Sequence, residues 1–364
     1  MNYLCPIICR IEKTKMQIDT CKNVKREYNE THPINFGAVP RVRRIHMKMR
    51  KLLAVLMTAA IAISLCACGG GAKMTMGTGS ATGTYYGFGG VLGQYMKNYA
   101  DIEVRVVSTD GSKANIQGID AGDYQLGTVQ SDVMAYAWEG MRSFDGGKID
   151  SFRVVAGLYA EAVQLVTMDE NIKSVADLKG KSVSIGAPGS GVYFNAMDVL
   201  TAAGLTEQDI NPQYQSFSDS TDALKDGKID AAFIVAGAPT PAITELCTTN
   251  SAYLVPIDGD IAGTLMASCP FYTTYSIPAG TYPGQTADVQ TVTVKATLIV
   301  SAKAEDDQVY NLTKAIFDHM SDIAKENGKG AELSIANATS GMTAPFHPGA
   351  ARYFAEQGFT VPTA

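Results

Sequence analysis

The sequence predicts an α/β protein made of two similar lobes that face each other across a cleft. Strand-like and helix-like segments alternate along most of the chain, which is typical of α/β folds. Residues 74–86 and 183–194 share one plan, in which a short strand leads into a Gly/Ser/Thr-rich loop and aromatic residues then open an amphipathic segment. We therefore expect two lobes that close on a ligand as a clamp.

A second pair of segments extends this repeat. Residues 121–130 and 226–235 each read as a helix end with a glycine near its C-cap, followed by a buried strand that ends at a small polar or glycine-rich loop. Open α/β sheets bind ligands at the carboxyl ends of their strands. Both Gly-rich loops are therefore expected to border the cleft.

Two extended apolar runs are predicted to cross between the lobes. They cover residues 154–168 and 291–300. With these as the crossing strands, the first lobe would be discontinuous and comprise residues 73–163 and 297–364. The second lobe would comprise residues 164–296.

The start of the chain has the pattern of a targeting segment. A basic stretch at 48–51 precedes an apolar run at 52–65, which is too short for a comfortable transmembrane helix. Leu65-Cys66-Ala67-Cys68 then resembles the lipobox of bacterial lipoproteins. We expect residues 47–67 to be a lipoprotein signal peptide, Cys68 to carry lipid and 68–72 to be a tether; a plain signal peptide is the alternative.

Charge separates this leader from the rest of the chain. Residues 1–67 contain 12 basic and 4 acidic residues, which leaves 18 basic and 32 acidic residues in 68–364. An acidic body without a basic stripe argues against a nucleic-acid partner. A secretion signal should begin the chain, so we expect residues 1–46 to be a mis-called upstream extension, with a real cytoplasmic extension as the alternative.

Few residues in the mature chain suggest metal binding or catalysis. Cys247 and Cys269 have no further Cys or His at metal-ligand spacing, so no metal is expected, and either a disulfide or two separate thiols is compatible with the sequence. His319 and His347 are not part of a recognisable Ser/His/Asp or Cys/His arrangement. The Gly-rich loops fit neither a P-loop nor a dinucleotide fingerprint, so no cofactor and no catalytic residue are expected.

The loops have a chemistry suited to ligand binding. A Gly/Ser/Thr loop that enters a helix offers free backbone N–H groups and the positive end of the helix dipole, which suits a carboxylate; an ordinary tight turn is the alternative. Tyr85 and Tyr193 are expected to wall the pocket, and Phe194 to pack in the core. Tyr159 and Glu161 are placed where they could line its floor.

The same stretches resemble a known family. The resemblance covers nearly all of residues 73–360 and is to the solute-binding subunits of TRAP transporters of the TAXI subfamily. It rests on GTGSATGTYY (77–86), GDYQLGTVQSDV (122–133), SVADLKGKSVSIGAPGSG (174–191), LKDGKIDAAFIVAGAPTPAI (224–243), SIPAGTYPGQ (276–285) and FHPGAARYFAEQG (346–358).

The resemblance implies a type II periplasmic-binding-protein fold and a role in transport. Amino acids such as glutamate, or small carboxylates, would be delivered at the outer face of the cell membrane to a permease driven by an ion gradient. The ligand-binding residues carried over from the family are Gly79, Thr82, Thr84, Tyr85, Gln130, Ser131, Tyr159, Ser190, Gly191, Tyr193 and Gly237. No arginine lies in a Gly-rich loop, so loop amides are expected to hold the carboxylate.

Three other functions fit the same residues. They are an ABC-type substrate-binding protein, a lipoprotein that senses a solute, and an enzyme on the same fold. An enzyme would need a reactive Cys or His at the cleft.

Overall fold

One mixed ten-stranded sheet organises the chain, in the order β2-β1-β3-β10-β4-β7-β5-β6 with β8 beside β4 and β9 beside β10. The computed structural model describes residues 72–144 and 146–363. Its strands are β1 Ala72–Gly77, β2 Ile102–Val107, β3 Leu126–Gln130, β4 Phe152–Thr167, β5 Ser182–Ser184, β6 Asn211–Gln213, β7 Ala231–Ala236, β8 Tyr253–Val255, β9 Thr273–Ile277 and β10 Val289–Ser301.

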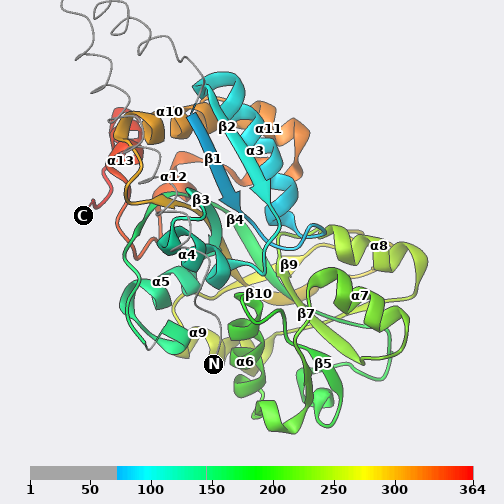
Figure 1. The fold of residues 1–364 in the computed structure, drawn as a ribbon. Coiled ribbons are helices and arrows are strands. Elements are labelled where there is room, and N and C mark those ends of the chain that lie inside the picture. Colours follow the sequence, from blue (N-terminus) through cyan, green and yellow to red (C-terminus); the bar gives the residue numbers. More distant parts are fainter. Residues whose placement is uncertain (1–71, 145, 364) are drawn as a thin grey trace, which may run out of the picture. The chain divides into compact units, whose positions relative to one another are not determined.

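Helices connect and cover these strands (Figure 1). The α-helices are α3 Thr84–Ala100, α4 Ser112–Ala121, α5 Ser131–Glu139, α6 Val192–Ala202, α7 Phe217–Lys225, α8 Pro241–Thr249, α9 Gly259–Ser268, α10 Asp306–Phe317, α11 Met320–Glu326, α12 Ile335–Thr339 and α13 Pro348–Glu356. The short 3₁₀ helices are η1 Arg142–Phe144, η2 Val175–Leu178, η3 Glu207–Asp209 and η4 Gly328–Glu332.

The sheet contains the same arrangement twice. Strands β2, β1 and β3 run parallel and are bordered by the antiparallel β10. Strands β6, β5 and β7 are likewise parallel and are bordered by the antiparallel β4. Parallel neighbours need crossover connections, which α3 and α4 supply in the first half and α6 and α7 in the second. The repeat predicted from the sequence is confirmed.

The two long strands β4 and β10 join the halves. They pair antiparallel, from Ala162 with Thr293 to Phe152 with Ser301. Beyond this shared stretch, β4 continues along β7 and the start of β10 pairs with β9. The two predicted crossing strands are therefore confirmed, and they lie at the centre of the sheet.

Each half has its own hydrophobic core, and we call the halves the first and second lobe. The core of the first lobe includes Phe88 of α3, Leu298 of β10 and Phe354 of α13. In the second lobe, Phe233 and Ile234 belong to separate clusters, because neighbouring residues of a strand point to opposite faces of the sheet. The fold is thus an α/β clamp of two lobes; the lobe boundaries given above remain a prediction.

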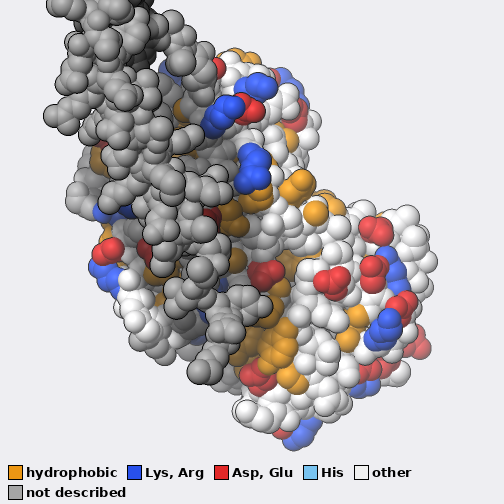
Figure 2. Space-filling model, viewed as in Figure 1, with side chains coloured by type: hydrophobic (Ala, Val, Ile, Leu, Met, Phe, Trp, Pro, Cys, Tyr) orange, Lys and Arg blue, Asp and Glu red, His pale blue; other side chains and the backbone are white. Residues whose placement is uncertain are grey.

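Charged residues on the surface of the second lobe occur in pairs of opposite sign. Acidic and basic side chains are interspersed around α7 and α8 (Figure 2). Lys225 lies 3.3 Å from Asp222 and 3.2 Å from Glu245, and Lys228 lies 2.8 Å from Asp226. These lysines are balanced by carboxylates rather than gathered into a patch that would attract a polyanion.

Several predictions concern residues outside the described part of the chain. The upstream extension, the signal peptide and Cys68 all lie within residues 1–71, and residue 72 of the predicted tether is the first residue of β1. Among the described residues, no helix has both the length and the apolarity needed to cross a membrane. Cys247 and Cys269 are free thiols, with Cys269 in the core of the second lobe.

Candidate ligand-binding cleft

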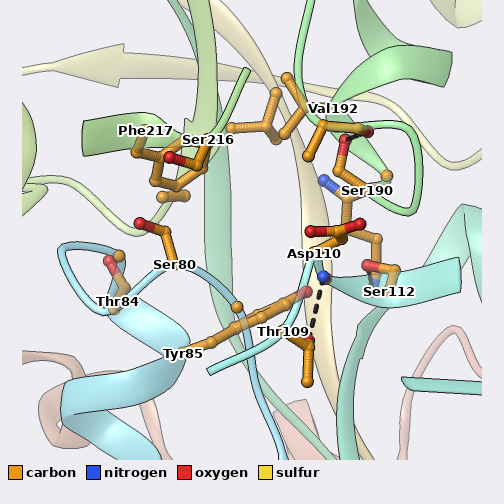
Figure 3. Close-up of a pocket in the computed structure, with 18 of the residues that line it drawn as sticks. Ser80, Thr84, Tyr85, Thr109, Asp110, Ser112, Ser190, Val192, Ser216 and Phe217 are labelled. Atoms are coloured by element: carbon orange, nitrogen blue, oxygen red, sulfur yellow. Dashed lines mark hydrogen bonds between the residues drawn. The ribbon is translucent and has the colours of Figure 1, made fainter. Parts of the chain in front are cut away.

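The carboxyl ends of six strands meet around one cavity of about 50 Å³ between the lobes. Figure 3 shows Ser80, Thr84, Tyr85 and Thr109 on one side of it, facing Ser190, Val192, Ser216 and Phe217 on the other. The lining residues come from the ends of β1, β2, β3, β5, β6 and β7 and from β4, and they are Gly79, Ser80, Gly83, Thr84, Tyr85, Thr109, Asp110, Gly111, Ser112, Gln130, Glu161, Ala187, Ser190, Gly191, Val192, Gln215, Ser216, Phe217, Val235 and Ala236.

Four helices begin in the wall of this cavity. The first residues of α3, α4, α6 and α7 are Thr84, Ser112, Val192 and Phe217, and all four line it. The first N–H groups of a helix have no partner within the helix, and they carry the positive end of its dipole. This part of the wall can therefore hold an anionic group without a cationic side chain.

The wall also carries acidic side chains. The Glu161 side chain on β4 is 1% exposed and accepts a hydrogen bond of 2.5 Å from the Tyr85 hydroxyl. Burial raises the pKa of Glu161 well above its ordinary value, and the nearby Asp132 carboxyl adds to this, whereas the Tyr85 hydrogen bond and the Lys329 charge lower it. Asp110 also lines the cavity, and no Lys, Arg or His among the described residues does so. A ligand group that is cationic or donates hydrogen bonds would be favoured here.

Hydrogen bonds join the two lobes on both sides of the cavity. On one side, the Ala114 N–H donates to the Gly189 carbonyl at 3.0 Å. On the other side, the Ala242 N–H donates to the Thr82 carbonyl at 3.1 Å, and the Thr84 hydroxyl donates to the Gly237 carbonyl at 2.8 Å. The structure therefore represents the clamp in a closed state.

Gln130 reaches from the first lobe to the second at the edge of the cavity. Its Nε2 donates to Asn195 Oδ1 of α6 at 3.0 Å, while its buried Oε1 has no hydrogen-bond partner within the described part of the chain. A Cβ atom on Gly191 would lie 1.6 Å from that Oε1. The Gln130 carbonyl can take this position only because residue 191 is glycine.

Asp132 lies behind Gln130 with no solvent exposure. Its Oδ2 accepts a hydrogen bond of 3.0 Å from Asn195 Nδ2, and its Oδ1 has no partner among residues that the structure describes. Burial raises the pKa of Asp132 to about 7; the Val133 N–H and the Asn195 amide oppose this shift, and the Asp198 charge adds to it.

The structure brings together six of the eleven residues proposed from the sequence as ligand contacts. Those that line the cavity are Gly79, Thr84, Tyr85, Gln130, Ser190 and Gly191. Two others, Thr82 and Gly237, contribute carbonyls to the contact between the lobes rather than to the cavity wall.

The remaining three point elsewhere. Tyr159 packs in the first core with its ring centroid 5.2 Å from that of Phe88. The Ser131 hydroxyl accepts from the Lys295 N–H at 3.2 Å, and the Tyr193 hydroxyl donates to Glu207 at 3.4 Å, away from the lining residues. In the closed state none of these three residues lines the cavity. Their role as ligand contacts stays a proposal. Phe194, expected in the core, is confirmed there.

Two lining turns were missed from the sequence. They are 109–112 after β2 and 215–217 after β6. Each turn follows the second strand of its lobe and leads into a helix, so the two turns are equivalent in the repeat. Applying the strand–loop–helix pattern to every strand end would have found them. Strand β6 has only three residues and includes Pro212, which weakens its strand signal.

No histidine among the described residues lines the cavity. His319 stacks on Tyr99 with ring centroids 3.6 Å apart, and His347 caps the start of α13. Within residues 72–144 and 146–363, no group of three or more His, Cys, Asp or Glu residues is arranged to hold a metal ion.

Substitution Gly191→Ala should displace the Gln130 side chain from the closed contact. The added methyl group would overlap Gln130 Oε1 at 1.6 Å, so the closed contact must shift. We expect solute affinity to fall by about 100-fold, as for loss of a few kcal/mol. Isothermal titration calorimetry would measure it. The matched control is Gly90→Ala in α3, where a Cβ meets nothing within 4 Å; equal affinity losses in the two variants would contradict this prediction.

Asp132 should make stability depend on pH. Its pKa is about 7 in the folded protein against an ordinary 3.8, so the folded state holds an extra proton between these values. The contribution of Asp132 to the free energy of unfolding should therefore be greatest below about pH 4. It should fall as the pH rises to about 7, by at most about 4 kcal/mol. Urea unfolding from pH 4 to 8 should show this fall in the wild type and a smaller one in Asp132→Asn. The exposed Asp120→Asn on α4 is the control, and a parallel dependence in wild type and Asp132→Asn would refute the assignment.

Comparison with known proteins places the chain in a family. Among solved structures, it is similar to the alkanesulfonate-binding protein SsuA from Xanthomonas axonopodis pv. citri, with 20% identity, a TM-score of 0.45 and coverage of 78% of this chain and 83% of that one. SsuA from Escherichia coli is 16% identical, with a TM-score of 0.41 and coverage of 79% of this chain and 90% of that one. A putative L-cystine ABC transporter protein from Listeria monocytogenes is 17% identical, with a TM-score of 0.45 and coverage of 72% of this chain and 98% of that one. The model of the NMT1-like family matches residues 76–358, and the chain belongs to that family.

Proposed function

We propose that this chain is an extracytoplasmic solute-binding protein that captures a small amino acid between its lobes and delivers it to a TRAP-type permease. The observation that supports this most is the closed cavity at the carboxyl ends of six strands, with hydrogen bonds between the lobes on both sides. Its volume of about 50 Å³ holds a few water-sized groups, which suits a small solute. Since the described residues that line it include no recognisable catalytic set, the solute would leave unchanged.

The helix starts and the acidic side chains in the cavity wall together favour a zwitterion. The starts of α3, α4, α6 and α7 suit a carboxylate, and the acceptors Glu161, Asp110 and Gln130 Oε1 suit an ammonium group. A dicarboxylate would place its second carboxylate beside Glu161, with no Lys, Arg or His among the described lining residues to balance it. Of the two solute classes expected from the sequence, the amino acid therefore fits the cavity better.

Membrane attachment and export rest on the sequence. The lipobox-like residues 65–68 support a lipid on Cys68, and the tether would leave the lobes free outside the cell membrane. Coupling to an ion-gradient-driven permease rests on the resemblance to TAXI-type subunits.

Matched solute pairs should test the zwitterion directly. Titration calorimetry would compare L-glutamate with glutarate and L-alanine with propionate. For one of the two pairs, we expect the amino acid to bind about 100-fold more tightly than its analogue, because the analogue lacks the ammonium group that would pair with Glu161, Asp110 and Gln130 Oε1. In Glu161→Gln this preference should shrink at least about tenfold. A tighter-binding dicarboxylate, or turnover of any solute, would rule the proposal out.

Transport would identify the permease class. Cells that express the chain with its permease should lose uptake of the bound amino acid when the ion gradients are collapsed, and keep it when ATP is depleted with the gradients clamped. A permease-free strain is the control. Uptake that follows ATP instead would indicate an ABC-type binding protein.

A further inference from the structure

Arg142 forms an ion pair between the lobes, outside the cavity. Its Nη2 lies 2.8 Å from Asp198 Oδ1 on α6, and its guanidinium lies 4.4 Å above the Tyr136 ring of α5. Arg142 also has a φ of 54°, in the left-handed region that residues other than glycine and asparagine seldom adopt. Such a backbone conformation persists where surrounding contacts fix it, and here the ion pair and the aromatic contact do so.

Hydrogen bonds continue from this ion pair to the cavity. The Tyr272 hydroxyl donates to Asp198 Oδ2 at 3.0 Å, and Asn195 Nδ2 donates to the Tyr272 oxygen at 2.8 Å. Asn195 Oδ1 then accepts from Gln130, which lines the cavity. We call these five residues, Gln130, Asn195, Tyr272, Asp198 and Arg142, the polar chain.

The polar chain connects the lobes at both of its ends. Gln130 and Arg142 belong to the first lobe, and the three residues between them belong to the second. Asn195, Tyr272 and Gln130 are all buried, and the Arg142 side chain is 35% exposed. If the lobes separated, Gln130 would lose Asn195 and Arg142 would lose Asp198, while the bonds of Tyr272 within the second lobe could remain.

We infer that the polar chain holds the clamp closed and couples the solute cavity to the exposed Arg142–Asp198 ion pair. Asn195 is the positioning residue in this arrangement. Its Nδ2 is committed to Asp132 and Tyr272, which leaves its Oδ1 to accept from Gln130 and turns the Gln130 carbonyl away from it. The inference rests on the proposed function, since closure matters only if the cavity receives a solute.

A permanently packed interface is the competing interpretation. Tyr136 also contacts Phe194 and Phe271 of the second lobe, with ring centroids 5.7 and 6.1 Å apart. If these apolar contacts alone held the lobes together, loss of Arg142 would alter global stability and leave the opening of the cavity unchanged.

Amide hydrogen exchange of the solute-free protein distinguishes these two interpretations. The Ala114 and Ala242 N–H groups donate only across the lobes and lie on opposite sides of the cavity, so their exchange reports opening. The main variant is Arg142→Asn, because asparagine tolerates the left-handed backbone while removing the guanidinium. Its control is Lys325→Asn, which removes an ion pair of 2.7 Å within α11.

We expect both reporter amides to exchange roughly tenfold faster in Arg142→Asn, the effect of one charged hydrogen bond. Asn195→Leu should give a larger increase, and amides in β10 should be unchanged in both variants. Unchanged reporter amides in Arg142→Asn, or reporter amides unprotected in the wild type, would overturn the inference. Because no solute is added, failure of every amino acid to bind would defeat the proposed function and leave this result interpretable.

Discussion

The structure depends on one geometric constraint, which is that the carboxyl ends of parallel strands from both lobes face each other. Each parallel strand must be followed by a helix that returns along the sheet, so every strand end becomes a turn into a helix. In this chain the turns after β1, β2, β5 and β6 place Thr84, Ser112, Val192 and Phe217 around one cavity. Within the described residues, only β4 and β10 run between the lobes at its base, so the lobes can close while the turns keep their local structure.

Charge in the cavity follows from this backbone arrangement. Helix starts supply partial positive charge without lysine or arginine, and β4 supplies the carboxyl of Glu161. Because Glu161 is buried, its pKa is raised, and burial favours the protonated form of this group. A solute with an ammonium group could replace that proton, whereas a second carboxylate could not.

Much of the fold was predictable from the sequence, and less of the site. The duplicated plan and the crossing strands were found because glycine-rich turns and apolar runs are local features. Tyr159 and Glu161 show the limit: they are two residues apart on one face of β4, yet Glu161 lines the cavity and Tyr159 packs on Phe88. Alternation predicts the face of a strand on which a residue lies. How far the cavity extends along that face depends on packing by α3, which is distant from β4 in the sequence.

The contacts that complete the cavity also join the two lobes. Gln130 has its Nε2 bonded to Asn195 and its Oε1 against Gly191, and both partners belong to the other lobe. In an open clamp the Gln130 amide would be free to rotate, and the acceptors around the ammonium position would not be assembled. Observed affinity is the intrinsic affinity multiplied by the closed fraction, so residues remote from the solute can change binding by changing that fraction alone. Affinity in this protein would then depend on Asn195 and Arg142 as well as on residues that touch the solute.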